Sequence, residues 1–379
     1  MRKSSYYGAG SGSGLRVTVK DVARVLGVSP STVSNAYNRP DQLSKKLRER
    51  VFEVAREMGY AGPDPLGRSL RRRRSDAVGV LFGDRLSYVF ADPAAMQFLE
   101  GFSEAIEGAG LGLVMLPGVS AVGGDEAMVR SAAIDGVLIH SMASDDPLVA
   151  AVMERRLPVV VVDQPVVGGV PSVSVDDVEA GRLAAEHLLE LGHERIAVIA
   201  TRLALDARSG PAGPARQKSA TVRPSRERLG GISAVMEEAG LSWGDVVVYE
   251  CSESTLDQGK AAAVGLLSAS GPPTAMIALS DQLAFGAMEA AEDLGLSLPE
   301  DLSVIGFDDV PAAELTTPTL TTLHQPHAEK GLMAGRRLIA RLDRDAKTGE
   351  DDPAKDNLAE DDLLLPTRLV VRDSTAKPR

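Results

Sequence analysis

The sequence predicts an α/β protein in which a small N-terminal unit of three helices precedes a body of two doubly wound lobes built on parallel sheets. Three observations lead to this fold class: capped helix patterns over residues 18–58, alternating strand and helix patterns after residue 76, and a change in the sign of the charge between the two parts. A chain of 379 residues is also long enough for two or three domains.

The charge is strongly asymmetric along the chain. Residues 1–74 hold 16 Lys and Arg against 6 Asp and Glu, about +10, whereas the remainder holds 25 against 47, about −22, which together give the net charge of −12. A basic segment on an acidic body indicates that only the basic segment meets a polyanion such as nucleic acid. The alternative is a solvated basic tail.

The first helix is predicted from Val19 to Leu26. Thr18 is an N-cap with an acidic residue, Asp21, three positions later, which is the pattern of a capping box. Gly27 can adopt the left-handed conformation that ends a helix. Apolar residues at helical spacing predict the buried side of this helix: Val22, Val25 and Leu26.

The second helix is short and polar, with Ser29 as its N-cap and Pro30 as its first residue. Two short helices joined by a tight glycine turn form a helix-turn-helix, whose second helix enters the major groove of DNA. Hydroxyl and amide side chains suit this place because they both donate and accept hydrogen bonds. An ordinary surface helix is the alternative. The inward residues are predicted to be Val33 and either Ala36 or Tyr37, packed against Ala23 and Val25, with Pro30, Ser31, Ser34 and Asn35 outward.

A third helix is predicted to start after the cap Ser44, with Leu47, Val51, Val54 and Met58 as its buried stripe. Three capped helices in a basic unit favour DNA binding over a plain helical surface. We expect DNA bases to be read by Pro30, Ser31 and Asn35, and the remaining contacts of this unit, chiefly to phosphates, to come from Thr18, Thr32 and Ser34.

Residues 62–75 are predicted to be a hinge. Within it "DPLGRSL" (64–70) has Asp64 as a cap and Pro65 in the first turn, but so short a helix is unstable alone and would need DNA to form. Leu70 is the expected minor-groove wedge, while Arg68 and the four arginines of 71–74 neutralise phosphates. The alternative is a disordered basic linker whose Leu70 merely touches the body.

The body contains seven short apolar runs of strand type that alternate with helical patterns such as 181–191 and 282–294. Strands that are apolar on both sides indicate parallel sheets covered by helices on both faces. Leu363 to Val371 is a possible further strand pair. The seven runs are "AVGVLF", "LGLVML", "DGVLIH", "PVVVVD", "RIAVIA", "AMIAL" and "LSVIGF".

Polar residues follow several of these runs, at the strand ends where ligands bind in such sheets. Carboxylates and a guanidinium can bind the hydroxyl groups of a small ligand, and the expected ligand contacts are Asp163, Arg228, Ser280 and Asp308. Asp84 and Asp92 are weaker candidates. For each of these residues the alternative is an N-cap or a structural ion pair, and Asp281 is predicted to be a helix cap.

Other features carry no chemistry of their own. The single cysteine, Cys251, is predicted to be buried and inert, and His193 to be structural. Residues 206–225 form either a mobile lid or, as we favour, a disordered insertion, and the acidic segment 343–362 has a disordered composition. No motif of a hydrolase, phosphate loop or metal site is present, so we predict no enzyme activity, cofactor or metal.

Long motifs of this chain resemble the lactose/galactose-repressor (LacI/GalR) family. They include "VTVKDVARVLGVSPSTVSNAYNRPDQLSKKLRERVFEVAREMGY" (17–60), "VSVDDVEAGRLAAEHLLELGHERIAVI" (173–199), "RERLGGISAVMEEAGL" (226–241) and "PTLTTLHQP" (318–326). The sequence departs from that family in its long 206–225 segment and in Ser280, where the family often has asparagine. The glycines and serines of residues 1–15 predict a flexible arm. The resemblance implies a DNA-binding headpiece (16–61), the hinge (62–75) and a periplasmic-binding-protein-like body (76–375) whose two lobes are crossed by three chain segments.

The resemblance also implies a ligand-responsive transcriptional regulator, most often a repressor, that binds a near-palindromic operator in double-stranded DNA as a homodimer. Its effector is expected to be a sugar, with a nucleoside or purine corepressor as the alternative. A cytoplasmic location is expected, because the first residues lack the continuous apolar stretch of a secretory signal. No membrane segment is expected, because the longest apolar runs are far shorter than a bilayer requires. Three other classes are weighed against this one: a freestanding sugar-binding protein, a structural nucleoid protein, and a hydrolase or isomerase acting in the cleft.

Overall fold

The computed structural model describes residues 17–62, 74–118, 126–346 and 362–379. The chain divides into two compact units, Met1–Ser75 and Asp76–Arg379, which we describe separately. The predicted arm, the hinge helix with Arg68 and Leu70, and all but the ends of the acidic segment 343–362 lie outside the described residues.

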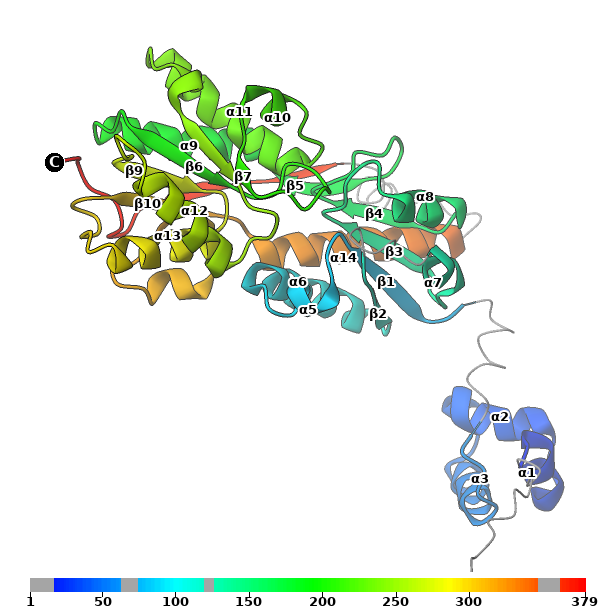
Figure 1. Cartoon of the computed structure of the whole chain (residues 1–379). Coiled ribbons are helices and arrows are strands. Elements are labelled where there is room, and N and C mark those ends of the chain that lie inside the picture. Colours follow the sequence, from blue (N-terminus) through cyan, green and yellow to red (C-terminus); the bar gives the residue numbers. More distant parts are fainter. Residues whose placement is uncertain (1–16, 63–73, 119–125, 347–361) are drawn as a thin grey trace, which may run out of the picture. The chain divides into compact units, whose positions relative to one another are not determined.

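The N-terminal unit consists of three helices around one small core (Figure 1), which confirms the predicted helix-turn-helix unit. The carboxylate of Asp21 accepts hydrogen bonds from the N–H and the Oγ1 of Thr18 at 3.0 and 2.6 Å, and Gly27 ends the helix with a φ of 67°. Ser29 Oγ accepts from the N–H of Thr32 at 3.1 Å and so caps the second helix. The elements are α1 (Val19–Leu26), α2 (Pro30–Asn38), η1 (Pro40–Gln42) and α3 (Lys45–Glu57).

One predicted core residue of this unit is wrong. Val25 is 62% exposed, while its neighbours Val22 and Ala23 are fully buried. Two residues along an α-helix is a rotation of about 200°, so Val25 and Ala23 cannot face the same partner. Leu47 and Met58 are only half-buried on α3, and the core is made instead by Val22, Ala23, Val33, Ala36, Val51, Val54 and Ala55.

The first lobe of the body is a six-stranded sheet in the order β12-β5-β4-β3-β1-β2, in which every neighbouring pair is parallel. Helices α6 and α14 share the core of one face, and α7 and α8 cover the other. The strands are β1 (Ala77–Phe82), β2 (Gly112–Leu116), β3 (Gly136–His140), β4 (Val159–Val162), β5 (Ser172–Val175) and β12 (Leu363–Leu365). The helices are α5 (Leu86–Val89), α6 (Pro93–Gly108), α7 (Glu126–Ser131), α8 (Pro147–Glu154) and α14 (His327–Ala346).

The second lobe is a seven-stranded sheet in the order β13-β11-β10-β9-β6-β8-β7, parallel except for β7 and β13 at its edges. Its strands are β6 (Ile196–Ala200), β7 (Gly210–Pro211), β8 (Val247–Glu250), β9 (Ala275–Ala278), β10 (Ser303–Asp308), β11 (Thr321–His324) and β13 (Arg368–Val370). Its helices are α9 (Asp177–Glu190), α10 (Pro214–Lys218), η2 (Trp243–Asp245), α11 (Arg223–Glu238), α12 (Leu256–Leu267), α13 (Asp281–Asp293) and η3 (Pro311–Glu314).

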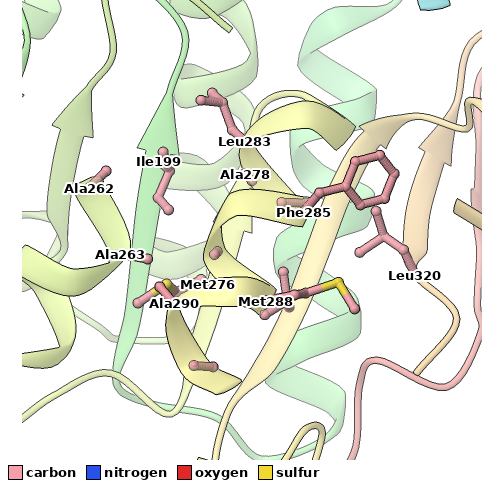
Figure 2. Packing of buried hydrophobic residues seen from close by; sticks show 14 of the residues in the cluster. Ile199, Ala262, Ala263, Met276, Ala278, Leu283, Phe285, Met288, Ala290 and Leu320 are labelled. Atoms are coloured by element: carbon pink, nitrogen blue, oxygen red, sulfur yellow. The ribbon is translucent and has the colours of Figure 1, made fainter. Parts of the chain in front are cut away.

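The two faces of the second sheet have separate cores. One face is covered by α12 and α13, and Figure 2 shows Leu283 and Met288 of α13, beside alanines of α12 and α13, packed against Ile199 and Met276 of the strands. The other face is covered by α9 and α11. The order of the strands means that the chain passes between the lobes three times: after β5, after β11, and between β12 and β13. These passages hold the two lobes side by side with their strand ends directed to a common space.

All seven predicted body strands are present, and the α/β architecture with two doubly wound lobes is confirmed. The predicted strand pair at 363–371 forms two strands, but they do not pair with each other, because β12 joins the first sheet and β13 the second.

The prediction of a disordered insertion at 206–225 is wrong. This segment forms the edge strand β7 and helix α10, and Arg216 fixes it by donating to Glu250 at 2.7 and 2.8 Å and to Asp206 at 2.7 and 2.8 Å. Glu250 is completely buried, so this ion pair ties the segment to β8. The composition of this segment, rich in Pro, Gly and Arg, is typical of disorder. It does not reveal that Arg216 has a buried carboxylate partner, Glu250, in a distant part of the sequence.

Candidate functional site

A cavity of about 200 Å³ lies between the two lobes of the body. We call it the interlobe chamber. Residues that follow β1, β3 and β4 line it from the first lobe, and residues that follow β6, β9 and β10 line it from the second. The four predicted ligand contacts all line it: Asp163, Arg228, Ser280 and Asp308.

Arg228 is held rigidly on the second turn of α11. Its Nε donates to Asp177 Oδ1 at 2.7 Å, its Nη1 donates to the carbonyl of Leu279 at 2.9 Å, and its guanidinium lies 3.5 Å from the centre of the Phe307 ring. Asp177 is buried at the start of α9; burial raises its pKa, and Arg228 opposes that rise. The guanidinium therefore combines a structural ion pair with a position in the chamber wall.

Asp308 ends β10 with a φ of 128° and accepts a hydrogen bond from Gln325 Nε2 at 2.8 Å. Burial raises its pKa to about 6, although Arg228 and Lys330 act in the opposite direction. His327 Nε2 lies 3.4 Å from Asp308 Oδ1 but makes no hydrogen bond with it or with any other described residue. The carboxylate of Asp308 and Nε2 of His327, which both line the chamber, can therefore form further hydrogen bonds with a ligand.

Asp163 is mainly occupied within the protein. It follows β4, and its carboxylate accepts from Lys330 Nζ at 2.8 Å and from Ser141 Oγ at 3.2 Å. Burial disfavours its charged form, but the ammonium of Lys330 holds the pKa of Asp163 below its usual value. Asp163 therefore forms a structural ion pair with Lys330, which was the alternative to a ligand contact, and it also lines the chamber.

Ser280 caps α13 by accepting from the N–H of Leu283 at 3.3 Å. The prediction that Asp281 is the cap is therefore wrong. Asp281 is the first residue of the helix, is fully buried, and accepts from the N–H of Val310 at 2.9 Å and from Thr322 Oγ1 at 2.6 Å. The side chain of Asp281 therefore links the start of α13 to the loop after β10 and to β11, all within the second lobe.

The two weaker candidates have different surroundings. Asp92 caps α6 by accepting from the N–H of Ala94 at 3.0 Å, and burial together with the charge of Asp308 raises its pKa to about 6. Asp84 forms a two-point ion pair with Arg202, at 2.7 and 2.8 Å, which joins the first lobe to the second. Asp92 thus lines the chamber, and its second carboxylate oxygen has no hydrogen-bond donor within the described ranges. Asp84 closes part of the rim of the chamber.

Several chamber residues were missed in the sequence. They are Tyr88, His140, Gln164, Arg202, Gln325 and His327. Burial lowers the pKa of His140 to about 4 and that of His327 to about 3, so both imidazoles are neutral near pH 7. His140, Gln164 and Arg202 end or closely follow strands, and a systematic reading of strand ends finds them. His327 starts a helix and has no such signal.

On the N-terminal unit, the predicted DNA contacts lie along α2 and its cap. Pro30 and Ser31 are exposed, as is Thr18 at the start of α1, and Thr32, Ser34 and Asn35 are half-buried. The hydroxyls of Ser31 and Thr32 lie 2.6 and 2.9 Å from Ser29 Oγ. Asn35 Nδ2 donates to Gln42 Oε1 at 3.3 Å, an exposed bond that water or a base can replace.

His193 and Cys251, which we predicted to have no chemical role, are both buried. His193 is buried and its ring nitrogens contact Thr274 Oγ1, Ser303 Oγ and the carbonyl of Ala376. Cys251 is buried, and burial raises its pKa to about 12. Within the described ranges, no group of three or more His, Cys, Asp or Glu side chains could hold a metal ion. None of the described helices is long and apolar enough to span a bilayer.

Two family models match the chain. The model of bacterial regulatory proteins of the lacI family matches residues 18–62, and the model of the periplasmic binding protein-like domain matches residues 185–375. The HTH-type transcriptional regulator Rv3575c of Mycobacterium tuberculosis is 41% identical to this chain over 327 residues, which cover 86% of this chain and 90% of that protein.

Solved structures resemble the whole chain. A complex of the transcriptional regulator CelR with cellobiose is 29% identical, with a TM-score of 0.65, and the match covers 95% of this chain and 100% of that one. The lac repressor dimer bound to operator and the anti-inducer ONPF is 26% identical, with a TM-score of 0.74, and the match covers 96% of this chain and 100% of that one.

Proposed function

The chain belongs to the LacI family of bacterial transcriptional regulators, and from this we propose that it is a repressor that binds a near-palindromic DNA operator as a homodimer and is switched by a sugar. The observation that carries the proposal is the presence, in one chain, of a capped polar helix in a basic unit and a polar interlobe chamber in an acidic body. A freestanding sugar-binding protein does not need the first of these features, and a nucleoid protein does not need the second.

For DNA binding, we propose base contacts from Pro30, Ser31 and Asn35 and backbone contacts from Thr18, Thr32 and Ser34. The cap at Ser29 supports this assignment, because it directs the N-terminal turn of α2 and its exposed residues outward. Hinge residues Arg68 and Leu70 are proposed to follow into the minor groove. We also propose that the headpiece comprises residues 16–61 and the body residues 76–375.

For the effector, we propose contacts with Arg228 and Asp308 and supporting positions for Asp163 and Ser280. The contacts already made by Asp163 and Ser280 within the protein favour this division of roles. A sugar is supported by the polar walls of the chamber and by the cellobiose complex of the related CelR.

Operator selection from a random DNA library, followed by titration of the full chain, tests the proposal. We expect one palindromic consensus, a protomer-to-site ratio of two, and a change in operator affinity on adding one sugar of a panel. Exchanging Ser31 and Asn35 should alter the selected sequence, because these side chains would present different donors and acceptors to the bases. Equal affinity for all DNA, with no response to any sugar, would contradict the proposal.

A further inference from the structure

We propose that the interlobe chamber selects an uncharged, polyhydroxylated ligand of single-ring size and rejects the phosphate esters of such ligands. This inference rests on the proposed role of the chamber as the effector site and narrows the class of effector. It follows from the charge pairing, the free polar atoms and the size of the chamber.

Each described cation in or beside the chamber wall is already paired with a protein carboxylate. The two arginines that line the chamber are Arg202 and Arg228, and each is already bound to a carboxylate, Asp84 and Asp177 respectively. The nearby ammonium of Lys330 is bound to Asp163. A phosphate group in this chamber would have to compete with protein carboxylates for every positive charge.

Carboxylates, in contrast, are in excess. Asp92 and Asp308 both line the chamber, and in the described part of the chain neither has a Lys or Arg nitrogen within 4.0 Å. His140 and His327 supply no positive charge, because burial keeps both neutral. Like charges in a buried space repel strongly, so a ligand with a phosphate would be disfavoured by the same groups that attract hydroxyls.

The free polar atoms also suit hydroxyl groups. His327 Nε2 is buried, lines the chamber and has no hydrogen-bond partner among the described residues. A hydroxyl can donate to an imidazole nitrogen or accept from it, and it can likewise donate to the carboxylates of Asp92 and Asp308. Phosphate oxygens that carry the charge can only accept, so they leave those carboxylates without a donor.

The size of the chamber indicates a compact ligand. Its volume of about 200 Å³ is smaller than the roughly 300–1,000 Å³ typical of pockets for drug-sized molecules. A single sugar or cyclic polyol ring fits such a space better than a nucleoside or a disaccharide.

Matched ligand pairs test the proposal on the full chain. Aldohexoses, aldopentoses and cyclic polyols are each screened beside their own monophosphate esters, first by thermal stability and then by calorimetry. We expect at least one unphosphorylated compound to bind and its ester to bind at least about 30-fold more weakly. A phosphate ester that binds better, or a panel in which no unphosphorylated compound binds, overturns the proposal.

Asp92→Asn tests whether charge is the cause, because asparagine is also a good N-cap and the loop geometry should persist. We expect the ratio of affinities between the neutral compound and its ester to fall at least fivefold. Asp146→Asn is the matched control, since Asp146 precedes Pro147 and caps α8 through the N–H of Leu148 at 2.9 Å, as Asp92 caps α6, but lies outside the chamber wall.

Asp308→Asn is a second, independent variant for the same measurement. If the affinity ratio is unchanged in both chamber variants, charge does not select the ligand and the inference is wrong. Operator titrations separate this result from the proposed function. A phosphate ester that binds more tightly than its neutral parent and changes operator affinity would overturn the inference alone, whereas a neutral polyol that binds without changing operator affinity would overturn the proposed switch alone.

Discussion

Asp281 is a buried carboxyl group that has no Lys or Arg partner among the described residues. Its oxygens accept from the N–H of Val310 and from Thr322 Oγ1, and burial together with the charge of Asp308 raises its pKa to about 7. In the unfolded chain the same group ionises near pH 4. The native state therefore holds an extra proton between these two values, so its stability is greatest at the acidic end of that range and falls as the pH rises through the folded pKa.

We expect Asp281→Asn to remove this dependence. Relative to the wild type, the free energy of unfolding of the variant should rise with pH by up to about 1.4 kcal/mol per unit between pH 5 and 7. Urea melts at several pH values measure it, and Asp145→Asn, a change at an exposed carboxylate, is the control. A constant difference between variant and wild type across this range would show that Asp281 is ionised in the native state.

Arg228 has two roles, a structural ion pair with Asp177 and a proposed contact with the effector, and one substitution can separate them. Truncation to alanine would leave Asp177 buried and unpaired, which destabilises a protein by roughly 3–5 kcal/mol and confuses any binding result. Arg228→Lys keeps the charge near Asp177 but loses the planar fork, so we expect effector affinity to fall about 10- to 100-fold with operator affinity retained. Calorimetry measures it, with the exposed Arg226→Lys in the same helix as control; undiminished effector affinity would remove Arg228 from the site.

The sequence predicted Asp163 and Asp308, charged chamber residues at strand ends, because strand runs and polar breaks are both local patterns, but it missed Arg202, which follows β6. It did not predict which partner each charge has. Asp177 and Arg228 are 51 residues apart, and Asp281 and Thr322 are 41 apart, so their pairing depends on the packing of helices against the sheet. Asp281 was wrongly predicted to be a helix cap for this reason. Its side chain is bound by Val310 and Thr322, which are distant in sequence, and not by the N–H groups of its own helix.

Helices α9 and α11 pack so closely that only glycine fits at their crossing. A Cβ atom on Gly231 would lie 2.0 Å from the carbonyl oxygen of Val178, and one on Gly181 would lie 2.2 Å from that of Arg228. Figure 1 shows the two helices side by side on the second lobe. This close approach also sets the position of Asp177 against Arg228, so the packing of two helices determines the geometry of one chamber wall.

Adjacent glycines in α11 allow a controlled test of this packing. We expect Gly231→Ala to lower the free energy of unfolding by about 1–3 kcal/mol or more, because backbone atoms must move apart, and to weaken effector binding through Arg228. Gly230→Ala places its Cβ in open space in the same helix and should raise stability by about 0.4–1 kcal/mol. Chemical denaturation compares the two; equal effects would mean that the crossing is not tightly packed.

At the scale of elements, the sequence predicted most of the strands that are continuous apolar runs. It missed the two-residue edge strand β7 and also β5, β8 and β11, whose segments "SVSV", "VVYE" and "TTLH" include polar residues that find partners only in the folded sheet. Thr321 and Thr322, for example, are fully buried. Thr321 Oγ1 accepts from the N–H of Arg372 at 2.9 Å, and Thr322 Oγ1 donates to Asp281 at 2.6 Å. Local hydrophobicity cannot reveal a polar residue whose partner comes from a distant segment.

The body as a whole is held together across its chamber by polar contacts as well as by the chain passages. Arg202, which follows β6, binds Asp84, which follows β1. Tyr88 Oη donates to the carbonyl of Ser254 at 3.2 Å, and the N–H of Arg223 donates to Gln164 Oε1 at 2.6 Å. Such contacts link two lobes whose relative position governs access to the chamber, and a change in this position is a common way to couple a ligand site to a distant surface.

Of these contacts, the ion pair between Arg202 and Asp84 should contribute most to closure. Its two bonds are short, at 2.7 and 2.8 Å, and it separates the interlobe chamber from a neighbouring cavity that both residues also line. We expect Arg202→Met to widen the distribution of distances between the lobes and to accelerate effector release. The charge-swapped pair Asp84→Arg with Arg202→Asp should restore much of the closure, because opposite charges again face each other across the rim.

Pulsed electron resonance between spin labels on Glu107→Cys and Ala269→Cys, one exposed site on each lobe, measures this distribution directly. The native Cys251 does not interfere, because it is buried and its raised pKa keeps it as the unreactive thiol. Arg130→Met is the control, since Arg130 pairs with Glu126 and Glu154 inside the first lobe. If Arg202→Met leaves the distance distribution as narrow as in the wild type, then the hydrogen bonds of Tyr88 and Gln164 and the three chain passages suffice to hold the lobes closed, and effector entry must be controlled by another part of the rim.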